Sequence, residues 1–319
     1  MSIERTATAS QSQLLLSLIN SADSALSKSQ AQVASGKVST DYTGLGDKVS
    51  LLEAARTAAT KSDAYQANTT LAIDQANLQD TQLSSLSDLA NQLRQAITQA
   101  VANGDGSSLP SEAQSVFEQA SQILNAKDAN GNYLYGGDKD NTAPLNVTSL
   151  AQLAALPSVA SAFSNGTLKK SVAVGDGQTV QLGVLASDAG TALLQTLKDI
   201  ATFDAGPTGN FAGSTALTKP QSDFLTAELP SAIGAAQSVN SVAADNGFVF
   251  NQLKDAADHQ QALSTLYTGF VSNLENVDLP TAITQLNQNQ VALQAALQVS
   301  SRLGQISLLN FLGAPTATA

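Results

Sequence analysis

Carboxylate and amide side chains alternate in one short segment, in a pattern that could suggest calcium binding. Asp138, Asp140 and Asn141 would supply the oxygen ligands. The twelve-residue calcium loop also needs glycine at its sixth position and glutamate at its twelfth. Ala143 and Ser149 occupy those two positions. The segment is therefore predicted to be a polar turn, and no metal site is expected.

The single histidine, His259, lies between Asp258 and Gln260, and the sequence offers no partner residues that would make it a catalytic base. Two Gly-Asp-Gly triplets, at 104–106 and 175–177, lack the strand-to-helix context of a phosphate-binding loop, so they are predicted to be turns. The sequence also has no Gly-x-Ser-x-Gly elbow. We therefore expect no enzyme, no catalytic residue and no cofactor.

Composition limits the possible partners. The chain has 319 residues, a formal net charge of −11 and a pI near 4.4. Nucleic-acid binding needs clustered lysine and arginine, so this class is excluded. With no cysteine, no tryptophan and 4% aromatic residues, the buried surface must come from small aliphatic side chains in thin seams between helices. No stretch resembles a membrane span or a cleaved secretory signal, so any export is expected to use another route.

Residues 279–319 have the pattern of a helix that packs against another helix. This segment holds one charged side chain, Arg302. Its apolar residues recur at steps of three and four or their sum, at Leu279, Ile283, Leu286, Leu293 and Leu297. Gln290 fills the remaining slot. This spacing is typical of a narrow coiled-coil seam, and the missing charges on the free side predict that other protein covers it.

The N-terminal segment has matching properties. Residues 6–22 carry no charge, and a continuous four–three pattern runs through Leu15, Ile19, Ala22, Leu26, Ser29 and Val33. The two chain ends are therefore predicted to pair with each other and then with neighbouring subunits. The predicted assembly interface consists of Leu15, Ile19, Leu26, Val33, Ile283, Leu286, Leu293, Leu297, Leu303, Ile306, Leu309 and Leu312.

The first half of the chain is predicted to be mainly helical. One helix should cover about 10–35 and end at Gly36, and a second should run from near Val49 to about Ala102. The segment Asn103-Gly-Asp-Gly106 breaks it. A short helix should follow from near Pro110 to about 126, and Tyr133-Leu-Tyr135 is predicted to be a strand.

The pattern changes between about 144 and 219. Val172–Val174 and Val180–Leu182 flank a Gly-rich turn and predict a β-hairpin, and a short helix is expected around residues 193–197. From Gln221 the chain should return to helix, with a local break at Pro230. A four–three repeat from Val249 to Val277 then predicts a coiled coil that loses register at residues 278–280.

The sequence thus predicts a mainly α fold: an elongated rod of long N- and C-terminal coiled-coil helices with a small α+β insertion. Three domains are expected. Residues 1–40 with 279–319 form a terminal coiled-coil assembly domain. Residues 41–143 with 220–278 form a helical rod domain with a short β-hairpin. Residues 144–219 form an inserted outer α+β domain.

Four segments carry a family resemblance: Gln32-Val-Ala-Ser-Gly-Lys37, Gly131-Asn-Tyr-Leu-Tyr-Gly-Gly137, the helix 286–298, and Ile306-Ser-Leu-Leu-Asn-Phe-Leu312. The first is similar to the "Q-L-S-S-G-K" element of the flagellin superfamily of bacterial flagellar axial proteins. The second and fourth resemble the "G-x-Y-L-F-x-G" and "L-S-L-L-D-Y-L" segments of its hook-associated protein 3 members, the hook–filament junction proteins. The chain is identified as resembling that group.

The resemblance implies a structural axial component of the bacterial flagellum that adapts the hook to the filament. It implies an extracellular location, export without a cleaved signal peptide, and an export chaperone. The implied partners are the hook-side junction protein, flagellin and further copies of the chain in a helical layer. It also implies terminal helices that become ordered on assembly, where packing against neighbours offsets the entropy of ordering.

Two alternatives remain open. Flagellin itself, the bulk filament subunit, shares the same general pattern. A secreted glycan- or surface-binding module, using 144–219, belongs to a different class. That region has only Phe163, Phe203 and Phe211 as aromatic residues, which weakens sugar stacking. An enzyme is the most remote choice.

Overall fold

The computed structural model describes residues 2–213 and 216–312. These residues form two compact units. The terminal unit combines both ends of the chain, residues 2–60 and 264–312, and the central unit is formed by 61–263. Two long helices, α2 (Val49–Asn103) and α6 (Lys219–Glu275), run from one unit into the other. The three-domain division expected from the sequence has different boundaries and stays a prediction.

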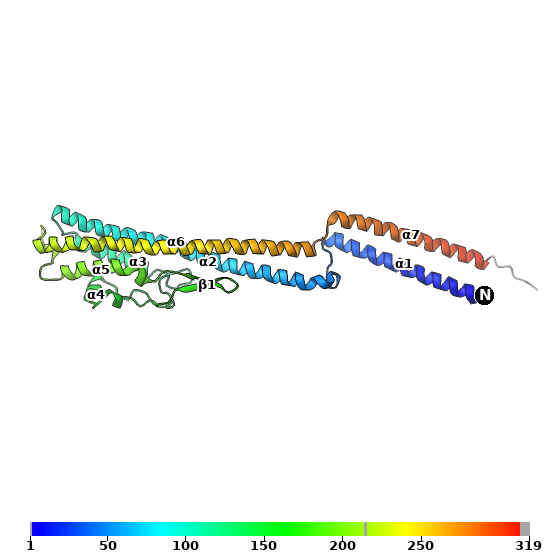
Figure 1. Cartoon of the computed structure of the whole chain (residues 1–319), viewed down its shortest axis with the longest axis horizontal. Coiled ribbons are helices and arrows are strands. Elements are labelled where there is room, and N and C mark those ends of the chain that lie inside the picture. Colours follow the sequence, from blue (N-terminus) through cyan, green and yellow to red (C-terminus); the bar gives the residue numbers. More distant parts are fainter. Residues whose placement is uncertain (1, 214–215, 313–319) are drawn as a thin grey trace, which may run out of the picture. The chain divides into compact units, whose positions relative to one another are not determined.

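The terminal unit is built around the antiparallel pair of α1 (Ser2–Ser35) and α7 (Leu279–Leu312), which lie side by side (Figure 1). Helix α1 ends because Gly36 adopts a φ of 69°, a left-handed conformation that glycine accepts without strain. A short 3₁₀ helix, η1 (Thr43–Lys48), then leads into α2. The predicted end of the first helix and start of the second are both confirmed.

The central unit packs shorter elements against α2 and α6 (Figure 1). In chain order these are α3 (Leu109–Leu124), α4 (Leu150–Ala155), η2 (Val159–Ala162), β1 (Lys170–Gly175), β2 (Gln178–Leu182), α5 (Ala186–Asp204) and η3 (Phe211–Gly213). Strands β1 and β2 form a two-stranded antiparallel sheet with an irregularity between Ala173 and Gly175. The predicted hairpin and the mainly α fold class are confirmed.

One continuous hydrophobic core joins the region 144–219 to the long helices. Leu93 of α2, Phe117 of α3, Leu193 of α5 and Val239 of α6 are fully buried within it. The rings of Phe203 and Phe224 stack with their centroids 4.0 Å apart. Because both sides contribute buried aliphatic and aromatic residues, the inserted region and the helices form a single packed body.

Two expectations about local structure are wrong. Tyr133–Tyr135 is not a strand: Tyr133 makes only an isolated bridge to Lys127, and the side chain of Gln79 bonds the Leu134 carbonyl at 3.0 Å. Because α2 and the core cover this segment, no neighbouring strand continues the ladder. The short β-hairpin expected in 41–143 is therefore absent from the described structure.

Pro230 does not break α6, which is continuous from Lys219 to Glu275. Proline has no backbone N–H, so the carbonyl four residues earlier does not receive its usual helical hydrogen bond. Pro230 and Thr226 both lie on the exposed side of the helix, so water can solvate the freed carbonyl. Leu225 and Ala232 are fully buried on the opposite side. The buried residues that precede and follow the proline in the sequence therefore keep the helix continuous.

Candidate assembly interface

The seam between α1 and α7 follows a strict four–three repeat. On α1 the covered side chains include the six predicted positions: Leu15, Ile19, Ala22, Leu26, Ser29 and Val33. On α7 the corresponding positions are Ala282, Leu286, Asn289, Leu293, Ala296, Ser300 and Leu303. Most of these side chains are half-buried, which is the geometry of a two-helix coiled coil with one side open.

The seam predicted on α7 is displaced by one residue at alternate positions. Leu286 and Leu293 lie in it as expected, but Ile283 is 47% exposed and Leu297 50% exposed. Leu279 and Gln290 are exposed as well. The prediction selected the larger apolar residues, Ile283 and Leu297. The seam instead contains their smaller neighbours, Ala282 and Ala296, whose side chains allow the two helices to approach closely. Leu303 is half-buried, and the side chains of Ile306, Leu309 and Leu312 lie outside the described residues.

A polar pair interrupts the apolar seam. The side-chain amide of Asn289 donates to the Ser29 hydroxyl at 2.5 Å and to the Ala25 carbonyl at 3.1 Å. The Ser29 hydroxyl in turn donates to the same carbonyl at 2.8 Å, and Ser29 is only 3% exposed. Such a buried polar contact lowers the stability of a coiled coil but defines how its helices align.

The two chain segments beside this seam are tied together by backbone hydrogen bonds. Lys37 and Asn276 form an isolated antiparallel bridge, in which the Val38 amide donates to the Glu275 carbonyl at 2.7 Å. The Val277 amide donates to the Gly36 carbonyl at 3.0 Å. One strand-like contact thus joins the connector after α1 to the connector before α7.

Charged side chains reinforce this bridge. The Glu275 carboxylate, with 15% of its side chain exposed, pairs with the Arg56 guanidinium and lies 3.7 Å from the Lys37 ammonium. Arg56 also donates to Glu53 at 3.0 Å and to the Tyr42 hydroxyl at 3.1 Å. We call the Lys37–Asn276 bridge together with the Arg56–Glu275 ion pair the connector clasp.

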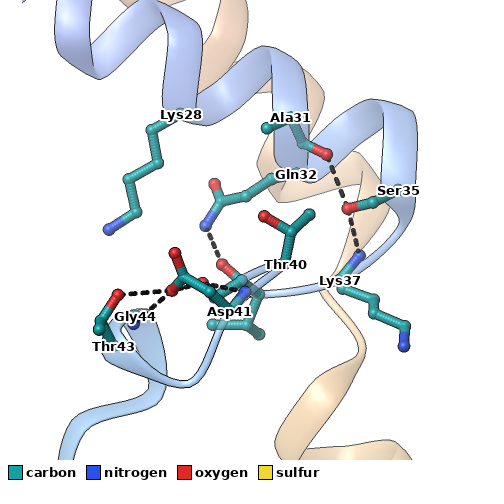
Figure 2. A pocket seen from close by; sticks show the side chains of 11 residues that line it. Lys28, Ala31, Gln32, Ser35, Lys37, Thr40, Asp41, Thr43 and Gly44 are labelled. Carbon is teal, nitrogen blue, oxygen red and sulfur yellow. Dashed lines mark hydrogen bonds between the residues drawn. The ribbon is translucent and has the colours of Figure 1, made fainter.

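A polar groove of about 350 Å³ lies beside the clasp (Figure 2). In it the Asp41 carboxylate accepts hydrogen bonds from the Thr43 hydroxyl at 2.6 Å and the Gly44 amide at 3.0 Å. These bonds, with one from Ser39, hold the pKa of Asp41 below its usual value. The carboxylate is thus used in shaping its own turn.

Large apolar side chains face outward from the terminal helices. Leu14 is 62% exposed, Leu18 54% and Val291 65%. Leu16, Leu297 and Val299 are exposed to a similar degree. Few charges accompany them on these segments. An apolar, charge-poor surface of this kind is typical of a protein–protein contact.

The acidic side chains of the segment 138–141 make separate contacts. Asp138 accepts a hydrogen bond from the Leu168 amide at 3.2 Å, whereas Asp140 pairs with Lys170 at 2.5 Å. The two carboxylates therefore take different partners. Within 2–213 and 216–312, no cluster of three or more metal-ligating side chains occurs. No helix of that same part of the chain has the apolar length needed to cross a bilayer.

The clasp and the Asn289–Ser29 pair are the features that sequence reasoning missed. Asn289 follows the four–three repeat of Ala282, Leu286 and Leu293, so shifting the pattern by one residue would have found it. The Arg56–Glu275 pair joins residues 219 positions apart, and no local pattern signals such a contact.

Comparison with known proteins supports the resemblance. Residues 231–312 match the family model of the bacterial flagellin C-terminal helical region. A solved structure of a putative flagellar hook-associated protein from Vibrio parahaemolyticus is similar with a TM-score of 0.58 and 18% identity. That match covers 74% of this chain and 99% of the other. No curated protein matches the sequence.

Two further solved structures have the same fold. Bacillus cereus FlgL is similar with a TM-score of 0.51 and 12% identity, covering 69% of this chain and 98% of its own. Flagellar hook associated protein-3 from Legionella pneumophila gives 0.53 and 13%, covering 70% and 98%. The resemblance to the flagellin superfamily is thus confirmed by sequence over 231–312 and by fold through these structures.

Proposed function

We propose that this chain, which carries a flagellin-type C-terminal helical region within the fold of flagellar hook-associated proteins, is a non-enzymatic axial component of the bacterial flagellum. Its specific role would be the adaptor layer between hook and filament. The outward apolar side chains of the α1–α7 pair are the observation that carries the proposal. Leu14, Leu18 and Val291 are more than half exposed, on segments with little charge to keep them in water.

Covering that surface with neighbouring subunits would stabilise an assembly. Each square ångström of apolar surface removed from water contributes roughly 25 cal/mol, so a helix face shared among several copies yields a large total. Subunits repeated by a rotation that does not close on itself form an open-ended helical tube. The nine predicted interface residues whose side chains the structure describes would then divide into two sets. Those in the α1–α7 seam hold the pair together, while Ile283 and Leu297 contact other subunits.

The proposal implies particular partners and a location. The layer would contact the hook-side junction protein at one edge and flagellin at the other, outside the cell in the flagellum. The chain would reach that place by export without a cleaved signal peptide and with the help of a chaperone. In this scheme the terminal domain assembles, the helical rod domain supports it, and 144–219 faces outward.

Binding to purified hooks tests the proposal. The full chain should bind to hook ends bearing the hook-side junction protein, and the bound layer should then accept flagellin. A chain truncated after Val277, which keeps 61–263 intact, should remain folded by circular dichroism but fail to bind. Normal binding by the truncated chain would contradict the proposal.

The match to the flagellin C-terminal helical region also favours a second candidate, the bulk filament subunit. The two roles differ in what the purified chain does alone. A filament subunit should polymerise without hooks into long filaments visible by electron microscopy. An adaptor should stay short or monomeric until a hook end is supplied, so unaided growth would favour flagellin.

A further inference from the structure

Apart from the Asn289–Ser29 contact, the α1–α7 seam contains little that defines the alignment of its two helices. Leucine, alanine and serine recur in the four–three repeat of both helices, together with Ile19 and Val33 on α1 and Asn289 on α7. In such a pair, a shift by one heptad brings similar side chains opposite one another and changes the buried apolar area little. Within the described part of the seam, Asn289 and Ser29 form one polar layer that opposes sliding, and a second feature outside the seam would reinforce it.

The connector clasp is placed to do this. Helix α1 ends at Ser35, two residues before Lys37, and α7 begins at Leu279, three residues after Asn276. The connections between each helix and the bridge are therefore too short to accommodate a shift. While the Val38–Glu275 and Val277–Gly36 hydrogen bonds hold, sliding α1 along α7 would require the ends of both helices to unwind.

The clasp also bears on how the pairing of the two helices begins. With it, the ends of the helices are already adjacent, so the first paired turn forms locally and later turns add to it.

We propose that the connector clasp sets the register of α1 against α7 and is the point from which their pairing propagates toward both chain ends. The Arg56–Glu275 ion pair secures the bridge, since Glu275 supplies both the backbone carbonyl that Val38 bonds and the carboxylate that Arg56 contacts. The inference concerns pairing inside one chain, so it does not depend on the proposed flagellar role.

Engineered disulfides would report the register directly, because the chain has no cysteine. Ala22 and Ala296 stand one heptad beyond Ser29 and Asn289, so Ala22→Cys with Ala296→Cys reports the observed register. Ala22→Cys with Leu303→Cys reports a shift by one heptad. In the full chain at low concentration, the first pair should oxidise and the second should not, since disulfides need closely spaced backbones.

Weakening the clasp should change this outcome. With Arg56→Met and Glu275→Gln added, the ion pair that secures the bridge is lost, and cross-linking of the shifted pair should rise. Lys254→Met with Asp258→Asn removes an exposed ion pair within α6 and serves as the matched control; it should leave both cross-links unchanged. Equal cross-linking of both reporters in the chain with an intact clasp would overturn the proposal, as would clasp variants that behave like the control.

Hydrogen exchange gives a second readout that does not depend on cysteine substitution. In the full chain the Val38 and Val277 amides should exchange at least about tenfold more slowly than the amides of 13–20, because pairing frays away from the clasp. The clasp variants should lose this difference while the amides of α3 and α5 stay protected, which shows that the central unit remains folded. Equal exchange at both places in the unaltered chain would contradict propagation from the clasp.

Discussion

The side-chain amide of Asn289 on α7 bonds the hydroxyl of Ser29 on α1, across 260 positions of sequence. This contact is the polar layer of an otherwise apolar or small-residue seam. Because a buried amide must find its partner, the contact favours one alignment of the helices over others at some cost in stability.

Replacing this polar layer should make the alignment of α1 and α7 less specific without lowering the stability of the pair. Asn289→Leu combined with Ser29→Ala removes both partners, so no buried polar group is left unpaired. We expect the terminal helices to melt at the same or a higher temperature by circular dichroism. We also expect the disulfide reporters to show more shifted pairing. Asn289→Leu with Ser29 retained is the control, and a large loss of helicity in the double variant would contradict the prediction.

The outward apolar side chains should matter for assembly and not for folding. Leu14→Gln with Leu18→Gln should leave helicity unchanged but abolish binding to hook ends, because the residues are 62% and 54% exposed within one chain. Leu168→Gln, at a position 66% exposed in the central unit, is the matched control and should bind normally. The readout is co-sedimentation with purified hooks. Full binding by the double variant would count against the proposed surface.

Glu228 should make the central unit less stable as the pH rises. Burial raises the pKa of this carboxyl above its usual value, and the nearby charge of Asp199 acts in the same direction. A raised folded-state pKa favours the protonated form in the folded protein. This contribution to the unfolding free energy is therefore fully present below the unfolded pKa and lost as the pH rises through the folded pKa.

Urea unfolding of the full chain and of Glu228→Gln, across the pH range from 4 to 8, would measure this contribution. The variant should be the more stable protein at neutral pH, and the advantage should shrink as the pH falls. Glu118→Gln, at an exposed position of α3, removes one negative charge without burial and provides the matched control. A constant difference for Glu228→Gln would show that its charge is not responsible.

Two glycines in the central unit should respond in opposite directions to alanine. At Gly209 an added Cβ would lie 1.9 Å from the Phe203 carbonyl oxygen, so Gly209→Ala should cost more than about 2 kcal/mol of unfolding free energy. At Gly234, inside α6, the same atom meets nothing within 4 Å. Gly234→Ala should therefore stabilise the helix by roughly 0.5–1 kcal/mol. Urea midpoints of the two variants test both, and similar changes in both would refute the steric argument.

Periodic sequence patterns predicted the helices and the hairpin because those elements depend on local residue spacing. The end of α1 at Gly36 and the start of α2 at Val49 required only local rules of helix termination. Pro230 misled the same rules, because the packing of Leu225 and Ala232 outweighs one lost hydrogen bond. Tertiary packing therefore overrides a strong local preference at this position.

The candidate interface was predictable on α1 and only partly on α7. Along α1, four of the six covered positions carry large apolar side chains and the other two are Ala22 and Ser29, so the four–three repeat and the seam coincide. Along α7, large residues at Ile283 and Leu297 lie beside small ones at Ala282 and Ala296, and the small ones occupy the seam. Hydrophobicity alone cannot tell a covered alanine from an exposed leucine, because the choice depends on how closely the partner backbone approaches.

The contact between Lys37 and Asn276 also fixes an order of events for a newly made molecule. Whichever end emerges first must wait for almost the whole remaining polypeptide before its partner arrives. During that interval, the leading helix has no cognate surface within its own molecule.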